Sequence, residues 1–143
     1  MKQKIGIVLS VLWYGIITLF SHFPGQESSI QSAWVIGWFQ EMGLITDPED
    51  FSEVGFWIRK LAHFSLYAVL TFCLNLSGLR LRWVIISLII LASVDEFHQS
   101  FIPGRTGTYK DVIIDCLGGI FILLFIKWKV IRQSSCKIYR SYL

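Results

Sequence analysis

The chain has 143 residues, of which 54% are hydrophobic, and its formal net charge is +3. A soluble domain is usually about 45–50% apolar. Here the excess is concentrated in long runs, which is typical of membrane spans. We expect one small all-α membrane domain over residues 1–143. The three cysteines form no C-x-x-C pair, which argues against a disulfide or metal framework.

The first apolar run extends from Ile5 to about His22 and follows Lys2 and Lys4. This order would also suit a signal peptide. However, the run ends in Phe20-Ser21-His22-Phe23-Pro24, which offers no small-x-small cleavage site. We therefore expect a retained first transmembrane helix.

Three further apolar runs predict three more spans. The expected set of four covers about residues 5–22, 56–79, 83–101 and 112–128. A span needs about 20 apolar residues, with roughly 17–25 tolerated, so the first and fourth are short. A three-span alternative stays open, because Asp115 interrupts the fourth run.

The segment between the first two spans carries an amphipathic pattern. Apolar residues recur every four positions, at Ile30, Trp34, Trp38 and Met42. Their aromatic content suits the headgroup zone, so we expect an interfacial helix that ends at Gly43. Thr46-Asp47-Pro48-Glu49 then predicts the start of another helix. The interfacial helix is either a lid over an outward-facing site or an anchor for the loop.

Charged residues are distributed asymmetrically around the spans. Nine of the 13 Lys and Arg residues precede the first span, separate the second from the third, or lie at the end of the fourth or beyond. Six of the ten acidic residues lie between the first two spans, and no Asp or Glu lies on the basic side. The positive-inside rule therefore places both termini in the cytoplasm. Because the net charge follows this topology, it does not suggest a nucleic-acid partner.

Eight further charged residues would come together at the outer face. They are Arg59, Lys60, Asp95, Glu96, Arg105, Lys110, Asp111 and Asp115. A charge inside a bilayer costs about 2.5–3.5 kcal/mol even on the lenient insertion scale, so these groups must pair, face the bundle interior or reach water. A self-neutralising network of salt bridges would satisfy that need. A site for a polar ligand would also explain the His, Tyr and Gln residues nearby, and we favour it.

Helical spacing places these residues on shared faces. The sets separated by one turn are Arg59–His63–Tyr67, Asp95–Gln99 and Asp111–Asp115. Gly118 and Gly119 allow the backbone of another helix to approach closely. The segment 102–107 predicts a tight turn that returns Arg105 toward the helices.

At these residues the chain resembles the VanZ-like family of small bacterial membrane proteins. The matching motifs are Arg59-Lys60-x-x-His63-Phe64-x-x-Tyr67, Asp95-Glu96-x-x-Gln99, Pro103-Gly104-Arg105 and Asp111-Val112-x-x-Asp115-x-x-Gly118. The resemblance covers nearly the whole chain and implies a multi-pass protein of the bacterial cell membrane. The family is named after a member associated with low-level teicoplanin resistance, so the resemblance also implies a link to glycopeptide resistance.

Two positions depart from the family pattern. The family usually has asparagine where this chain has Asp115, and we expect this extra carboxylate to be protonated or to pair with Arg105. The turn after the first span contains Ser21-His22-Phe23, where the family often has Ser-Ser-Gln.

We expect an outward-facing polar site for an amphipathic or lipid-linked envelope molecule. In the enzyme hypothesis, Arg59 and Arg105 hold a phosphate or carboxylate. His63 then acts as general acid or base, oriented by Asp95 or Glu96. The expected catalytic residues are His63, Asp95, Glu96 and Asp111, and the expected substrate-binding residues are Arg59, Lys60, Tyr67, Gln99, Arg105 and Asp115.

Two alternatives stay open beside the enzyme. The same site can bind or shield a lipid or lipoglycopeptide without changing it. A metal-dependent hydrolase would use His63, Asp95, Glu96 and Asp111 as ligands, although four neighbouring cations disfavour a metal. We therefore expect no metal or other cofactor, and membrane lipid or a lipid-linked ligand as partner. Four short helices without repeats leave little room for a transporter.

Overall fold

The computed structural model describes residues 2–43 and 50–140, and within these ranges all regular structure is helical. In chain order the helices are α1 (Lys2–His22), α2 (Gly25–Glu41), α3 (Asp50–Leu76), α4 (Leu81–Gln99) and α5 (Tyr109–Arg140). The all-α prediction is confirmed.

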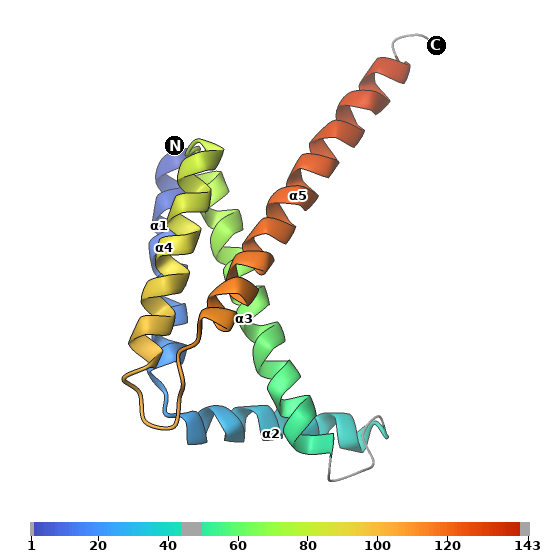
Figure 1. Ribbon diagram of the computed structural model, residues 1–143. Helices are drawn as coiled ribbons and strands as arrows, with labels where there is room; N and C mark the ends of the chain where they lie inside the picture. The colour runs from blue at the N-terminus through green and yellow to red at the C-terminus, as the bar shows by residue number, and fades with distance from the viewer. Residues whose placement is uncertain (1, 44–49, 141–143) are drawn as a thin grey trace.

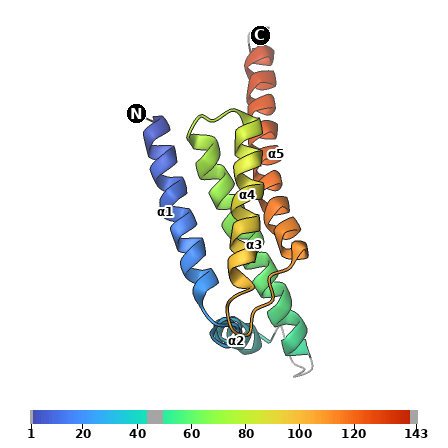
Figure 2. The same cartoon turned by 60° about the vertical axis from the view of Figure 1, so that its left-hand side comes forward.

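The helices form a bundle that is closed at one end by a crossing helix. In Figures 1 and 2, α1, α3 and α4 run side by side, while α2 lies across their lower end. The first half of α5 packs on α3, and its second half diverges from the bundle. The N-terminus, the α3–α4 turn and the C-terminus all lie at the end away from α2 (Figure 1). The basic segments of the sequence therefore share one end of the molecule.

The predicted spans correspond to helices but differ from them at the ends. α3 begins at Asp50, before the expected start at Phe56, because residues 50–55 are helical without being continuously apolar. α5 continues to Arg140, well past residue 128, because a basic polar segment can extend a helix as readily as an apolar one. The helix start expected at residues 46–49 lies outside the described residues.

The interior of the bundle is small and lies where α1, α3 and α4 meet. Its buried apolar side chains are Ile17, Tyr67, Leu70, Leu74, Val84, Leu88 and Ala92. Trp13 on α1 ties this core to α3, because its indole Nε1 donates a hydrogen bond to the Leu66 carbonyl oxygen at 2.9 Å.

Glycine residues on α5 allow α3 and α5 to approach closely. A Cβ atom added at Gly118 would collide with the backbone carbonyl of Phe64, and one added at Gly119 would collide with the side chains of Leu88 and Thr71. The close approach predicted from these two glycines is confirmed, and it fixes α5 against α3 beside the polar residues of both helices.

Most large apolar side chains of α1, α4 and α5 lie on the outside of the bundle, including Val11, Leu12, Ile90 and Leu124. By length and composition, one helix of the described residues is a candidate membrane span: α1, over Gln3–His22. The later helices carry ionisable residues within their apolar runs, as at Asp115. The four-span topology therefore stays a prediction.

A helix is present as α2 where one was expected after the first span. Its buried side holds Ile36, which faces α3 at Gly55. The opposite side exposes Trp34, which is 78% exposed, and Trp38, which is 60% exposed. Gly43 follows the helix with φ of +72°, a conformation that glycine adopts at little cost, so the predicted end of α2 is confirmed.

Candidate functional site

A cavity of about 770 Å³ opens between α1 and α3, beside the end that α2 closes. Its apolar wall comes from α1 and α3 and includes Trp13, Ile17, Phe20, Leu66 and Val69. Its polar wall is formed by Ser21, Arg59, Lys60, His63, Gln99, Arg105, Thr106 and Asp111. The cavity thus joins a cationic end to an apolar channel.

The turn between α4 and α5 brings Arg105 back to the end of α1. Its guanidinium donates to the carbonyl oxygens of Phe20 at 3.1 Å and Phe23 at 2.9 Å. It also donates to Gln99 Oε1 at 3.2 Å. Gly104 permits the turn through a φ of +75°. The predicted return of Arg105 is therefore confirmed, and part of its hydrogen-bonding capacity serves to hold α1, α4 and the turn together.

Burial lowers the pKa of the Arg105 guanidinium, and the nearby Arg59 charge acts in the same direction. The carboxylates of Asp95 and Glu96 oppose this shift. Because an arginine starts from a very high pKa, Arg105 keeps its positive charge at neutral pH.

Arg59 and Lys60, consecutive on α3, differ in their partners. Lys60 Nζ forms an ion pair with Asp111 Oδ1 at the start of α5. Arg59 lines the cavity and makes no hydrogen bond or ion pair with any of the described residues. Among the described residues, the Arg59 guanidinium is therefore a cation of the cavity wall that makes no hydrogen bond or ion pair and can meet a ligand.

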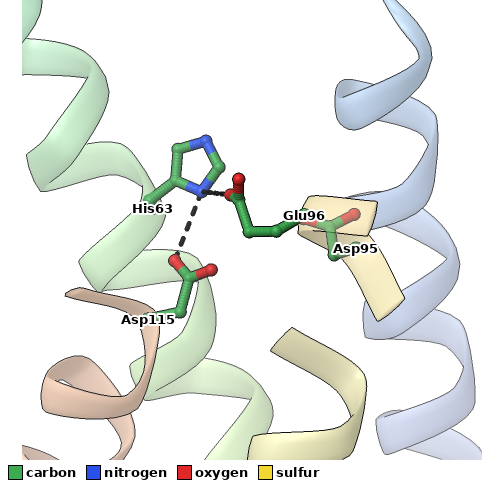
Figure 3. A group of neighbouring side chains, drawn as sticks. All are labelled: His63, Asp95, Glu96 and Asp115. Atoms are coloured by element: carbon green, nitrogen blue, oxygen red, sulfur yellow. Dashed lines mark hydrogen bonds and ion pairs between the residues drawn. The ribbon is translucent and has the colours of Figure 1, made fainter. Parts of the chain in front are cut away.

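His63 lies one turn beyond Arg59 and connects the cavity to a group of buried carboxylates. Its Nδ1 atom is 3.2 Å from Asp115 Oδ1 and 3.9 Å from Glu96 Oε1. Figure 3 shows His63, Glu96 and Asp115 pointing toward one another, with Nε2 of the imidazole directed away from both carboxylates. His63 thus receives its carboxylate contacts from α4 and α5 while its ring lines the cavity.

Polar residues of α4 hold the base of the site. Gln99 Nε2 donates to Asp95 Oδ2 at 3.0 Å and to Ser21 Oγ at 3.2 Å. Glu96 Oε2 accepts a hydrogen bond from the backbone N–H of Thr108, just before α5, at 3.1 Å. These bonds fix α4 relative to both α1 and α5.

The structure brings most of the predicted site residues together, but it changes several partners. Asp115 contacts His63, and its expected pairing with Arg105 is wrong. His63 contacts Asp115 and Glu96, whereas Asp95 is held by Gln99. Of the two carboxylates expected to orient His63, Glu96 lies 3.9 Å from its Nδ1 atom, and the hydrogen bond to this atom comes from Asp115.

Two further predicted residues have surroundings that differ from those expected, although Asp111 does line the cavity. Tyr67 is fully buried in the core, where its hydroxyl donates to the Leu91 carbonyl at 3.4 Å, so it has no access to the cavity. Asp111 is paired with Lys60 and is not part of the buried carboxylate group. Its place among the possible metal ligands is taken by Asp115, since His63, Asp95, Glu96 and Asp115 each offer one ligand atom within 4.8 Å of the others.

Ser21 and Thr106 line the cavity but were not predicted as site residues. Ser21 is buried and accepts from Gln99. The sequence marked Ser21 only as a serine in the turn after the first span. A single hydroxyl at a helix end is too common to indicate a site, so Ser21 could not be predicted as a site residue.

The VanZ/LLP1 family model matches residues 6–132 of this chain. The chain belongs to the VanZ/LLP1 family. Every residue of the cavity and of the carboxylate group lies within the segment that matches this family. No curated protein and no solved structure matches this VanZ/LLP1 chain.

Proposed function

We propose that this VanZ/LLP1 protein is a multi-pass protein of the cell membrane that binds the anionic headgroup of a lipid-tailed envelope molecule. The observation that supports this proposal is the cavity between α1 and α3, which is lined by Arg59 and Arg105 and by an apolar wall. A lipoglycopeptide also combines a polar head with an apolar tail. This property connects the proposal to the glycopeptide resistance for which the family is named.

Helix lengths and exposed apolar surface support the membrane-spanning part of the proposal. α4 has 19 residues, which at 1.5 Å per residue reach about 29 Å, close to the roughly 30 Å hydrocarbon core. The outward apolar side chains of α1, α4 and α5 would be a strong aggregation hazard in water but suit lipid contact. We assign spans to α1, α3, α4 and the first part of α5.

The charge distribution supports an outward-facing cavity. Arg80 and Arg82 lie at the α3–α4 turn, at the end away from α2, and Lys127 and Lys129 lie on the half of α5 that extends in the same direction. The positive-inside rule assigns that end to the cytoplasm. The cavity and the turn that carries Arg105 then lie toward the outer leaflet, where a lipid headgroup can enter from the side.

The cationic end of the cavity favours an anion. An arginine guanidinium binds phosphate or carboxylate oxygens through two parallel hydrogen bonds. Arg59 has this capacity unused among the described residues, and Arg105 uses three of its nitrogens on protein acceptors. Because two like charges lie close together, an anion between them relieves their repulsion. We therefore expect Arg59 to be the main contact and Arg105 a supporting one.

The test compares two lipids with identical acyl chains, a phosphatidic acid and an uncharged diacylglycerol, each added to neutral nanodiscs that hold the full chain. Native mass spectrometry measures which lipid the released protein retains. We expect retention of the phosphatidic acid and a loss of about 10- to 100-fold in affinity for Arg59→Gln, since a charged hydrogen bond contributes about 1.5–3 kcal/mol.

The matched control is Lys110→Gln, which removes an exposed cation outside the cavity wall. It should leave retention unchanged, because only a cation in the cavity contacts the headgroup. Equal retention of both lipids, or equal effects of the two substitutions, would refute the proposal. Chemical analysis of the recovered phosphatidic acid then shows whether binding is accompanied by turnover.

A further inference from the structure

Three carboxylates are buried together behind the cavity. Asp95 is 2% exposed, Glu96 is 4% exposed and Asp115 is fully buried. They come from α4 and α5, and His63 approaches them from α3 (Figure 3). Burying one carboxylate away from water already costs several kcal/mol unless a positive charge compensates it, so three within one group demand an explanation.

One oxygen of each carboxylate lies within 3.2 Å of a protein nitrogen, and the other makes no hydrogen bond among the described residues, although Glu96 Oε1 lies 3.9 Å from His63 Nδ1. Asp95 Oδ2 accepts from Gln99, Glu96 Oε2 accepts from the Thr108 N–H, and Asp115 Oδ1 faces His63. The other three oxygens, Asp95 Oδ1, Glu96 Oε1 and Asp115 Oδ2, are buried without a hydrogen-bond partner in the described part of the chain. Buried polar atoms are nearly always satisfied, so each such orphan calls for a partner.

The neighbouring cations do not supply that partner. Lys60 is engaged by Asp111. The Arg105 guanidinium is directed to Gln99 and to the carbonyl oxygens of Phe20 and Phe23. The sequence argument against a metal was that four cations lie nearby. The ion pair with Asp111 neutralises Lys60, whereas Arg105 keeps its charge near Asp95 and Glu96 but directs its hydrogen bonds to other acceptors.

We propose that His63, Asp95, Glu96 and Asp115 form a binding site for a divalent transition metal ion. One imidazole nitrogen with three carboxylate oxygens is a donor set suited to Zn²⁺ or Mn²⁺. The four ligand atoms lie within 4.8 Å of one another. Zinc–ligand bonds of about 2.0–2.2 Å place tetrahedral ligand atoms ~3.4 Å apart. Side-chain rotations that shift the four ligand atoms by about 1 Å therefore bring them to coordinating distance. The ion compensates the three carboxylates and satisfies their orphan oxygens.

The cavity offers an ion a path to these ligands, and neighbouring groups hold two of the carboxylates in place. His63 lines the cavity, so an ion that enters the cavity reaches the ligands at the imidazole. Gln99 and the Thr108 N–H each hold one carboxylate in place through its other oxygen. Such outer hydrogen bonds are the usual means by which metal ligands are oriented. The site thus lies directly behind the headgroup end of the cavity.

The test is the metal content of the full chain, purified in detergent without chelator and after removal of any histidine tag. Elemental analysis should find close to one Zn²⁺ or Mn²⁺ per chain. Asp115→Asn and Glu96→Gln should each weaken binding by more than the roughly 10- to 100-fold that the loss of an outer-shell partner costs. Glu41→Gln serves as the control, because it makes the same chemical change as Glu96→Gln at an exposed residue of α2, and it should keep the metal.

Cobalt substitution tests the same proposal in a way that a merely structural effect would not imitate. Co²⁺ bound by nitrogen and oxygen ligands absorbs visible light, and the band should appear with the parent chain and with Glu41→Gln but be lost with Glu96→Gln and Asp115→Asn. Circular dichroism checks that each variant stays helical. Protein without metal and without a cobalt band, or Asp115→Asn with the metal content of the parent, would overturn the proposal. No lipid is needed, so this result is independent of the binding proposed above.

Discussion

Gly118 and Gly15 show that the effect of a glycine depends on what surrounds it. Gly118 of α5 lies against the Phe64 carbonyl of α3, where an added methyl group has no space. Gly15 of α1 has no atom within 4 Å of the position that a Cβ would take. Both are helical, so the helix propensity of alanine favours both substitutions equally, and packing alone separates them.

We therefore predict opposite effects for one substitution at these two positions. Gly118→Ala should lower stability by about 1–3 kcal/mol, the usual cost of overpacking. Gly15→Ala should raise stability by about 0.5–1 kcal/mol, because alanine favours the helix. Thermal or denaturant unfolding in one detergent measures both. If Gly118→Ala is as stable as the parent chain, α5 does not pack on α3 as described.

At the scale of single helices, α2 has two faces with different surroundings. Ile36 and Ser32 are buried on the side that meets α3, whereas Trp34 and Trp38 are exposed on the other. Tryptophan is enriched at membrane–water interfaces because its ring is apolar and its N–H is polar. This arrangement favours α2 as a helix that lies in the headgroup zone and forms the rim of the cavity.

The depth of Trp34 in a bilayer tests this placement. In a variant that keeps Trp34 as its single tryptophan, lipids brominated close to the headgroup should quench its fluorescence more strongly than lipids brominated near the chain end. The control keeps only Trp13, which is half-buried on α1 and bonded to the Leu66 carbonyl, and should show a weaker dependence on depth. Strongest quenching of Trp34 from the chain end would exclude the interfacial position.

At the scale of the whole molecule, the α3–α4 and α4–α5 turns lie at opposite ends of the bundle. The α3–α4 turn shares an end with both termini, and the α4–α5 turn lies at the end where α2 crosses (Figures 1 and 2). With four spans, these two turns lie on opposite sides of the membrane. A three-span chain would leave the C-terminal part of α5 on the same side as the α4–α5 turn.

Cysteine labelling in intact cells distinguishes these topologies. In a background without native cysteines, Tyr109→Cys at the start of α5 should react with a membrane-impermeant maleimide in intact cells, because Tyr109 is exposed at the outer end. Leu79→Cys in the α3–α4 turn should react only after lysis. Arg132→Cys, at an exposed residue in the second half of α5, should also react only after lysis, whereas a three-span chain would leave it reactive in intact cells. The reverse pattern for Tyr109→Cys and Leu79→Cys would invert the orientation, and labelling of Arg132→Cys in intact cells would contradict four spans.

Much of the architecture follows from local sequence. Apolar runs and spacing by helical turns predict α1, α3, α4 and α5, because both are properties of neighbouring residues. The aromatic repeat predicts α2, and Gly43 predicts its end for the same reason. The start of α3 at Asp50 could not be predicted from hydropathy, since residues 50–55 are stabilised as helix without forming an apolar run.

The partners within the site could not be predicted in the same way. Arg59, His63 and Tyr67 share a stripe of α3, yet His63 lines the cavity while Tyr67 is enclosed by the core. Asp115 lies beside His63 and away from Arg105, although both pairings were compatible with the sequence. The rotation of each helix about its own axis decides these contacts, and that rotation is set by packing between segments far apart in the chain.

The sequence by itself determined that the ionisable residues gather at one end of a helical bundle, because burying a charge alone is too costly for any other arrangement. Only the tertiary structure decided which of those charged groups pair with one another. The close approach of α5 to α3 at Gly118 brings Asp111 to Lys60 and Asp115 to His63, and the turn after α4 directs Arg105 to the end of α1. Within the part of the chain that the structure describes, Arg59 thereby lines the cavity without a hydrogen-bond or ion-pair partner, and three buried carboxylates each keep one oxygen without a hydrogen bond.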